Sequence, residues 1–203
     1  MKNRISLTAG AVGLALALTA FACGKSRGAA DAGSENVKWN VEVYAVVPFD
    51  SIPLATDSAV LPLTYSYAVT DTAAVGAMLA ASDSLLAARG YVWQWVKYGS
   101  AESVDLVVMP SAPLLHEEVT VTDVSPIADC DDIVQVAFRF DDRRRWEEIT
   151  DANVGRRLAI VVDGRVLSAP QVNMAISGGA CAVTVPTQDL AELLPGRDMA
   201  DVK

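Results

Sequence analysis

Hydrophobic and polar residues alternate over several short stretches of this chain, with the period of two residues that is typical of β-strands with one buried face. The clearest stretch is Ile133–Phe140, in which Val134, Val136, Phe138 and Phe140 fall on the same side. Similar patterns predict strands over residues 37–47, 64–69, 91–98, 104–109 and 180–185. The chain is therefore expected to build a sheet of several short strands.

Other segments carry hydrophobic residues three and four positions apart, the spacing of an amphipathic helix. The longest begins after Thr70-Asp71-Thr72, whose side chains can cap a helix, and ends at Gly90. Two shorter helices are expected after Asp141-Asp142 and after Thr187. Because strands and helices are interleaved, we predict an α+β fold in which a mixed, mainly antiparallel sheet is covered on one face by two or three helices.

The most specific local pattern is a predicted hairpin between residues 157 and 170. Arg157–Val162 is almost entirely apolar, as in strands that are buried on both faces, and Asp163-Gly164 favours a tight turn with positive φ. Val166–Pro170 can then form the returning strand. We assign structural roles to the special residues here: Pro170 stands where no ladder hydrogen bond is donated, and Ser168 satisfies a nearby backbone group.

This hairpin and its surroundings resemble the head of the large periplasmic domain of SecD, an accessory membrane subunit of the bacterial preprotein translocase. The resemblance is carried by Asn153, Gly155, Arg156, Leu158, Ala159, Ile160, Val161, Asp163, Gly164, Val166, Ser168, Ala169, Pro170, Ile176 and Gly179. Upstream, Pro113–Val124 is similar to the family's approach to this pattern, although Glu117 replaces a usual glycine. The similarity is best over residues 105–197 and implies a non-enzymatic module that contacts polypeptide or the translocase.

The N-terminus has the layout of a secretory signal, with charged residues in Met1–Arg4, an apolar run over Ile5–Ala22, and Cys23 directly after it. One interpretation is a lipoprotein signal peptide at residues 1–22 with lipidation of Cys23. The other is an uncleaved membrane anchor, since about 18 apolar residues can just cross a bilayer. Both place the folded part outside the cytoplasm, as a membrane-anchored protein of the cell envelope that faces the periplasm or the exterior.

Residues 23–36 are rich in Gly, Ser and Ala and are expected to form a flexible linker, which leaves residues 37–203 for one domain similar to the SecD head. Removal of residues 1–22 would leave 14 basic and 25 acidic residues, a net charge of −11. Such a balance argues against nucleic acid as a partner and against charge-driven adhesion to anionic lipids. The expected membrane contact is the N-terminal lipid.

Cys130 and Cys181 would be the remaining thiols. In an oxidising compartment they are candidates for a disulfide, and the alternative is two unrelated small apolar side chains. Trp93 and Trp95 lie two positions apart and must share one face of a strand. They are either core residues or an exposed aromatic ledge that contacts extended polypeptide.

Residues that could support chemistry are few. His116 is the only histidine and is expected in a solvated loop beside two glutamates. Asp129, Asp131 and Asp132 crowd one turn but lack the spacing of an EF-hand, so a solvated turn is favoured over calcium binding. Arg143–Arg145 is flanked by acidic residues and is expected to form a solvated helix face. We therefore predict no metal, no cofactor and no enzymatic activity.

Three functional hypotheses follow. The first is a lipid-anchored binding module that assists protein export or folding by contacting polypeptide or translocase components. It would lack proton-driven motor activity, because the chain shows no further membrane segment that could carry protons. The second is an envelope scaffold or interaction lipoprotein that keeps the fold without a role in export. The third, an envelope enzyme, would need a pocket joining His116 to a hydroxyl group and a carboxylate.

Overall fold

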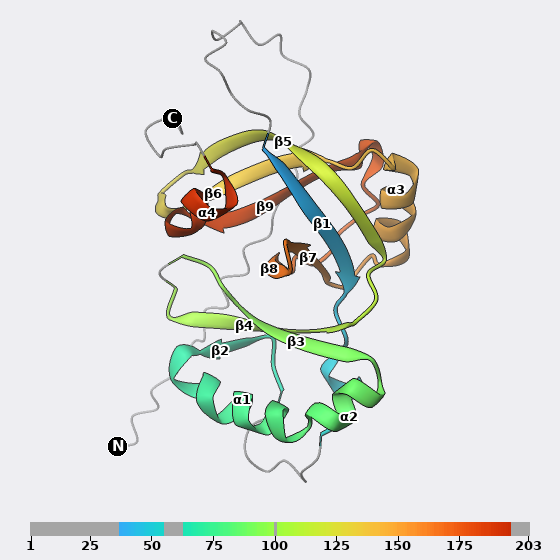
Figure 1. Cartoon of the computed structure of the whole chain (residues 1–203), viewed down its shortest axis with the longest axis vertical. Helices are drawn as coiled ribbons and strands as arrows, with labels where there is room; N and C mark the ends of the chain where they lie inside the picture. The colour runs from blue at the N-terminus through green and yellow to red at the C-terminus, as the bar shows by residue number, and fades with distance from the viewer. Residues whose placement is uncertain (1–36, 55–62, 100, 196–203) are drawn as a thin grey trace, which may run out of the picture. The chain divides into compact units, whose positions relative to one another are not determined.

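The computed structural model describes residues 37–54, 63–99 and 101–195 (Figure 1). The predicted signal peptide of residues 1–22, the lipidation site at Cys23 and the linker of residues 23–36 lie outside the described residues. Across the described ranges, no helix combines the length and the hydrophobicity that crossing a membrane requires.

The described strands form two sheets, and every pair of neighbouring strands is antiparallel. The six-stranded sheet has the order β8-β7-β1-β5-β6-β9. Its strands are β1 (Lys38–Ala45), β5 (Leu115–Ile127), β6 (Cys130–Arg139), β7 (Leu158–Val162), β8 (Arg165–Ser168) and β9 (Ala180–Pro186). The three-stranded sheet has the order β2-β4-β3, from β2 (Ser66–Ala68), β3 (Tyr91–Lys97) and β4 (Ser103–Pro110).

Four α-helices accompany these sheets in the described part of the chain. They are α1 (Thr72–Ala81), α2 (Asp83–Ala88), α3 (Arg143–Ala152) and α4 (Leu190–Leu193), with short 3-10 turns η1 (Phe49–Ser51), η2 (Val69–Asp71), η3 (Ser177–Gly179) and η4 (Thr187–Asp189). The α+β class is confirmed. The expectation of a single, mixed sheet is corrected to two antiparallel ones, because the strands 64–69, 91–98 and 104–109 pair only with one another.

The largest hydrophobic core lies on the inner face of the six-stranded sheet, under α3 and α4. The alternating face of β6 enters this core as predicted, with Val136 and Phe140 fully buried. Trp39 of β1 and Trp146 of α3 contribute the largest buried side chains from their elements. The edge strands β8 and β9 also contact each other, so the sheet curves around its own core.

The three-stranded sheet has a separate core on each face. On one face α1 and α2 cover it, with Val75, Leu79 and Leu86 packed against Leu106 of β4. The expected single helix after residue 70 is broken at Ser82, whose hydroxyl donates to the Met78 carbonyl at 2.9 Å. The other face packs against β7 and β8, so this end of the six-stranded sheet lies against the three-stranded sheet (Figure 1).

The region around His116 is a strand and not the predicted loop, although the His116 side chain is exposed, as predicted. It belongs to β5, a strand of 13 residues that pairs with β1, where His116 lies opposite Glu42. Tertiary pairing decides the structure here, because β1 offers a ladder partner that no local pattern reveals. Asp129 has a φ of 62° and lies in the turn from β5 into β6. Asp129, Asp131 and Asp132 therefore lie at the end of a hairpin.

Cys130 and Cys181 are far apart in the fold. Cys130 begins β6, whereas Cys181 lies on β9 opposite Phe138. Along β6, about eight extended residues separate Cys130 from Phe138, which lies opposite Cys181, a distance on the order of 25 Å. A disulfide requires Cα atoms within about 7 Å. Both thiols are free, and the fold does not allow the bridge that the sequence left open. Burial raises the pKa of the Cys181 thiol to about 12, although a hydrogen bond with the Ala182 backbone opposes this.

Candidate functional site

The predicted hairpin forms as expected and is a central structural element. Asp163 and Gly164 both have positive φ, 48° and 82°, as a two-residue turn of type I′ requires. All five residues of β7 are buried. Leu158 and Ile160 enter the core of the six-stranded sheet, while Ala159 and Val161 pack toward the three-stranded sheet.

Polar side chains of β3 close the outer edge of β8. The Gln94 amide donates from Nε2 to the Gly164 carbonyl at 3.0 Å, and its Oε1 accepts from the Val166 N–H at 3.1 Å. The Tyr98 hydroxyl accepts from the Ala169 N–H at 3.4 Å. Because an unpaired strand edge is open to pairing with other chains, these side-chain contacts protect β8.

A second contact between the sheets is an ion pair. Arg157 Nη1 donates to Asp105 Oδ2 at 3.2 Å and to the Ala169 carbonyl at 3.3 Å, and the guanidinium lies 4.6 Å from the centre of the Tyr65 ring. Burial, reinforced by the charge of Asp105, raises the pKa of Tyr98 to about 12, against the opposing influence of the Ala169 hydrogen bond and of Arg157. The Tyr98 phenol is therefore neutral at physiological pH.

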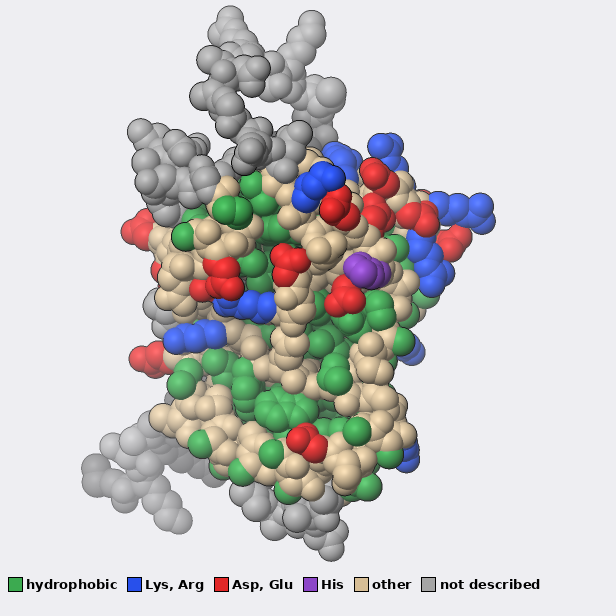
Figure 2. All heavy atoms as spheres, in the orientation of Figure 1, with side chains coloured by type: hydrophobic (Ala, Val, Ile, Leu, Met, Phe, Trp, Pro, Cys, Tyr) green, Lys and Arg blue, Asp and Glu red, His purple; other side chains and the backbone are tan. Residues whose placement is uncertain are grey.

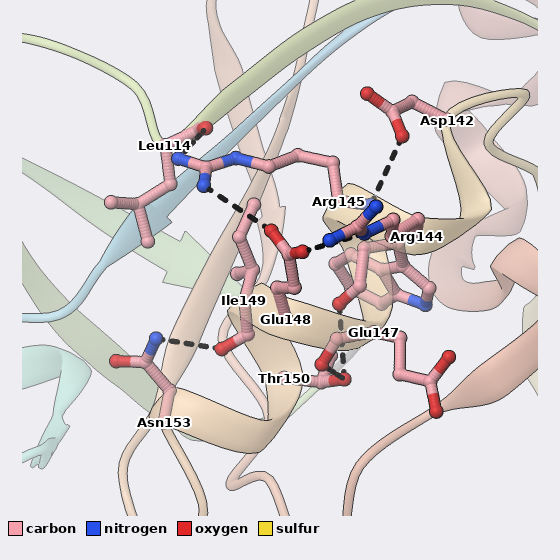
Figure 3. Close-up of polar contacts among 10 residues, drawn as sticks. Leu114, Asp142, Arg144, Arg145, Glu147, Glu148, Ile149, Thr150 and Asn153 are labelled. Atoms are coloured by element: carbon pink, nitrogen blue, oxygen red, sulfur yellow. Dashed lines mark hydrogen bonds and ion pairs between the residues drawn. The ribbon is translucent and has the colours of Figure 1, made fainter.

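Asn153, labelled in Figure 3, and Gly155 lie in the segment that joins α3 to β7. The Asn153 amide donates to the Ile149 carbonyl at 2.8 Å and closes the end of the helix. The buried Thr150 hydroxyl donates to the Trp146 carbonyl at 3.0 Å and accepts from the Ile176 N–H at 2.9 Å. Gly155 has a φ of 80°, which favours glycine, and its N–H donates to the Val172 carbonyl at 2.8 Å. Asn153 and Gly155, which help to carry the resemblance to the SecD head, therefore both have structural roles.

The basic cluster on α3 forms a solvated face with local ion pairs, as predicted. Arg144 Nε donates to Glu148 at 3.0 Å, and Arg145 lies 3.8 Å from the same carboxylate (Figure 3). The Asp142 side chain caps the helix by accepting from the Arg145 N–H at 3.0 Å. Exposed pairs of this kind contribute only tenths of a kcal/mol each.

Glu117, which replaces the glycine usual in the resembled family, has a clear structural role. Its carboxylate accepts hydrogen bonds from the N–H groups of Asp141 and Asp142 and so holds the turn that precedes α3 against β5. No local pattern indicated this contact, because the two partners are 24 and 25 positions away.

Gly179 and Pro170 also have structural roles. Gly179 has a φ of 76°, and a Cβ atom built there would lie 2.4 Å from the Phe140 carbonyl oxygen. Pro170 follows β8 and accepts from the Leu158 N–H at 3.1 Å. Ser168, in contrast, corrects a prediction: its Oγ is buried without a hydrogen-bond partner and so satisfies no backbone group.

Replacing Ser168 by Ala is expected to leave the free energy of unfolding unchanged or to raise it by about 1 kcal/mol, because a buried hydroxyl without a partner is a cost. The matched control is Thr150→Val, which removes a buried hydroxyl that has partners and should lose about 1–3 kcal/mol. Urea unfolding measures both. A loss in Ser168→Ala as large as that in Thr150→Val would contradict this description.

The side chains of Trp93 and Trp95 share one face of β3, toward α1 and α2. Both are half-buried against the core there. Trp93 donates from its indole N–H to Asp83 Oδ1 at 3.3 Å, and the two rings meet edge to face with centroids 6.3 Å apart. Figure 2 shows hydrophobic side chains gathered over this strand on the face toward the viewer. The indoles therefore pack into the fold, and their contact with polypeptide stays a prediction.

A cavity of about 130 Å³ borders the end of β3. It is lined by Trp95, Val96, Lys97, Arg165, Val166, Leu167, Pro186, Gln188 and Asp189. Arg165 forms an ion pair with Asp189 there, which neutralises its charge locally. Among the described residues, no three His, Cys, Asp or Glu side chains are grouped so that they could hold a metal ion.

Comparisons with known proteins identify a relationship over part of the chain. Residues 97–195, just under half of the sequence, match the family model described as SecDF, P1 head subdomain. The SecDF translocase subunit of Thermus thermophilus is 44% identical over 50 residues, which are 25% of this chain and 7% of that protein. SecD of Rickettsia conorii is 49% identical over 51 residues, 24% of this chain and 10% of that protein.

SecD of Acidaminococcus fermentans is 40% identical over 52 residues, 26% of this chain and 12% of that protein. The chain thus aligns with about a tenth of the length of these curated relatives. A solved structure described as a membrane component SecDF that enhances protein export overlaps with 73% of this chain and 56% of its own chain, at 22% identity and a TM-score of 0.33. Residues 97–195 of this protein are homologous to the P1 head subdomain of SecDF.

Proposed function

We propose that this protein is a non-enzymatic binding module of the cell envelope that assists protein export or folding. Its partners would be unfolded or exported polypeptide, or components of the Sec translocase. The observation that carries the proposal is the homology of residues 97–195 to the SecDF P1 head subdomain, whose relatives are named translocase subunits. A lipid on Cys23 would tether the module, as the N-terminal pattern of the sequence favours.

The residues that carry the resemblance to the SecD head make structural contacts, which supports a binding role over a catalytic one. Asp163 and Gly164 form a turn, Asn153 closes a helix, and Gly179 allows a close approach of two backbones. These residues support a rigid framework. A framework of this kind suits a protein that presents a surface to a partner.

A second candidate function is an envelope scaffold that keeps the fold without a role in export. It is favoured by the short alignments, which cover 7–12% of the first curated relatives. The parts of the chain before residue 97, including β3 and its two tryptophans, also lie almost entirely outside the family match. That region could bind partners that are specific to this protein.

The two candidates can be separated by photo-crosslinking in living cells. A photoreactive amino acid at Val92, which is 42% exposed on β3, would report partners of that strand. The same amino acid at Arg144, whose side chain is 90% exposed on α3, is the matched surface control. We expect newly synthesised exported chains or translocon components to be trapped from Val92. Recovery of envelope scaffold proteins alone would favour the second candidate and contradict the first.

A further inference from the structure

The backbone hydrogen bonds of β4 identify which groups of β3 face outward. The Val108 carbonyl accepts from the Val47 N–H at 2.7 Å, on the side of β4 that is turned away from β3. Leu106 directs its N–H to the same side and donates to the Tyr65 carbonyl at 2.9 Å. In an antiparallel ladder, directly opposed residues either bond to each other or both point away.

Trp93 lies opposite Val108, and Trp95 lies opposite Leu106. Their N–H and C=O groups therefore point away from β4, toward the open edge of the sheet, as do those of Lys97 by the same alternation. Within the described ranges, the backbone groups of Trp93 and Trp95 make no hydrogen bond at this edge. Gln94 and Val96 alternate with them and are bonded to β4.

This edge contrasts with that of β8, which Gln94 and Tyr98 cap with side-chain hydrogen bonds. In the described part of the chain, the fold thus closes one edge strand and leaves the seven-residue strand β3 without a partner along its outer edge. The cavity beside Trp95 and Lys97 leaves space along the same strand. A row of unpartnered donors and acceptors is the feature to which an extended chain adds as a further strand.

Charge decides between two possible occupants of the edge. The chain carries a net charge of −9, so a second copy of it would be repelled, whereas a neutral or basic segment would not. The Asp83 carboxylate beside Trp93 adds a local acceptor for a basic side chain of the incoming strand. Recognition through main-chain groups is also tolerant of sequence, as a binder of varied polypeptides requires.

We propose that an extended, neutral to basic segment of an unfolded polypeptide adds to β3 as a fourth strand of the three-stranded sheet. The proposal rests on the proposed function and names its binding mode. The open edge lies almost entirely before the family match, which begins at Lys97, the last residue of β3. The polypeptide gains main-chain hydrogen bonds from Trp93 and Trp95, while their indoles stay packed on α1 and α2.

Residue-resolved amide hydrogen exchange of the full chain tests the proposal. The probe is a peptide whose alternating Val and Thr residues match the seven residues of β3, with a Lys added at each end. At saturation the exchange of the Trp93 and Trp95 amides is expected to slow by about tenfold or more. The Gln94 and Val96 amides, already bonded to β4, are the internal control and should change little. A bound peptide that leaves the Trp93 and Trp95 amides unchanged would overturn the proposal.

A pair of variants at Lys97 tests the same edge by affinity. Lys97→Pro removes an outward N–H, which an edge strand tolerates, and Lys97→Ala removes the same side chain but keeps that N–H. The proline variant should bind the peptide about tenfold more weakly, and the alanine variant should stay within about twofold of the parent chain. Equal affinities for the two variants would argue against strand addition.

If Lys97→Pro fails to fold, a version of the peptide that is methylated at alternate backbone nitrogens provides the test of strand addition. It should lose binding to the unaltered chain, since it cannot donate along one edge. Undiminished binding of the methylated peptide overturns strand addition but leaves the proposed function standing. Failure of the chain to bind any unfolded polypeptide overturns strand addition together with the polypeptide-binding form of the proposed function, and leaves translocase components as the expected partners. If raising the protein concentration without peptide slows exchange of the Trp93 and Trp95 amides, and the protein then has the mass of a dimer, the edge binds a second copy. That result would overturn the proposal.

Discussion

Replacing Gly179 by Ala is expected to lower the free energy of unfolding by about 3 kcal/mol or more, because two independent costs coincide at this residue. Its φ of 76° lies in the left-handed region, where a side chain is strained. The added Cβ atom would also lie 2.4 Å from the Phe140 carbonyl oxygen, a backbone atom that cannot turn aside. The change also disturbs the 2.9 Å hydrogen bond that the Phe140 N–H donates to the Gly179 carbonyl.

Gly155→Ala is the matched control for this prediction. Gly155 has a comparable φ of 80°, but a Cβ atom there meets nothing within 4 Å. Its replacement should therefore cost only the conformational strain, about 1–2 kcal/mol. Urea unfolding of the two variants, followed by circular dichroism, gives the difference. Equal losses would mean that the approach of Gly179 to Phe140 imposes no steric constraint.

Trp39→Ala is expected to lower the free energy of unfolding by about 3–5 kcal/mol. The indole is 1% exposed in the core of the six-stranded sheet and meets Phe138 edge to face, with ring centroids 5.9 Å apart. Its N–H donates to the Leu193 carbonyl at 2.7 Å, which ties β1 to α4. The truncation therefore leaves both a cavity and a buried carbonyl without its donor.

Two variants separate these contributions. Trp39→Phe keeps an aromatic ring but loses the donor to Leu193, and should cost about 1–3 kcal/mol. Trp93→Ala removes an indole that is only half-buried and should cost clearly less than Trp39→Ala. The measurement is again the urea midpoint and slope for each variant. A larger loss in Trp93→Ala than in Trp39→Ala would place the main core of the protein around the smaller sheet.

Local signals predicted the elements whose structure is decided by neighbouring residues. The turn at Asp163-Gly164 has the positive φ values that the dipeptide indicated, and Asp142 caps α3 through its side chain. The buried face of β6 follows the alternation of Ile133–Phe140. These features need no knowledge of distant parts of the chain, because the geometry is contained within a few residues.

Features decided by long-range pairing were missed or left open. Residues 115–118 form a strand only because β1 lies beside them, and Glu117 caps a turn more than twenty positions away. Cys130 and Cys181 could be judged only when the register of β6 and β9 was known. Gln94 did leave a signal, since it is a lone polar residue in the apolar run of β3, and its role in capping β8 explains that pattern.

The candidate site follows the same division. The sequence indicated that Trp93 and Trp95 share one face, and the structure places both indoles against α1 and α2. The open edge of β3 depends on the strand order of the three-stranded sheet, which no local pattern contains. The candidate binding groups of this segment are therefore the outward backbone N–H and C=O groups of Trp93 and Trp95, and not their indole side chains.

Crosslinking from Val92 in pulse-labelled cells tests most directly whether the protein contacts exported polypeptide. If the protein contacts polypeptide during export, newly made exported chains should be trapped from Val92 immediately after the pulse and should disappear during the chase. Arg144 should trap them far less, because its surface on α3 consists of exposed ion pairs. A role in export is contradicted if Val92 and Arg144 trap the same stable envelope proteins and neither traps a newly exported chain or a translocon component.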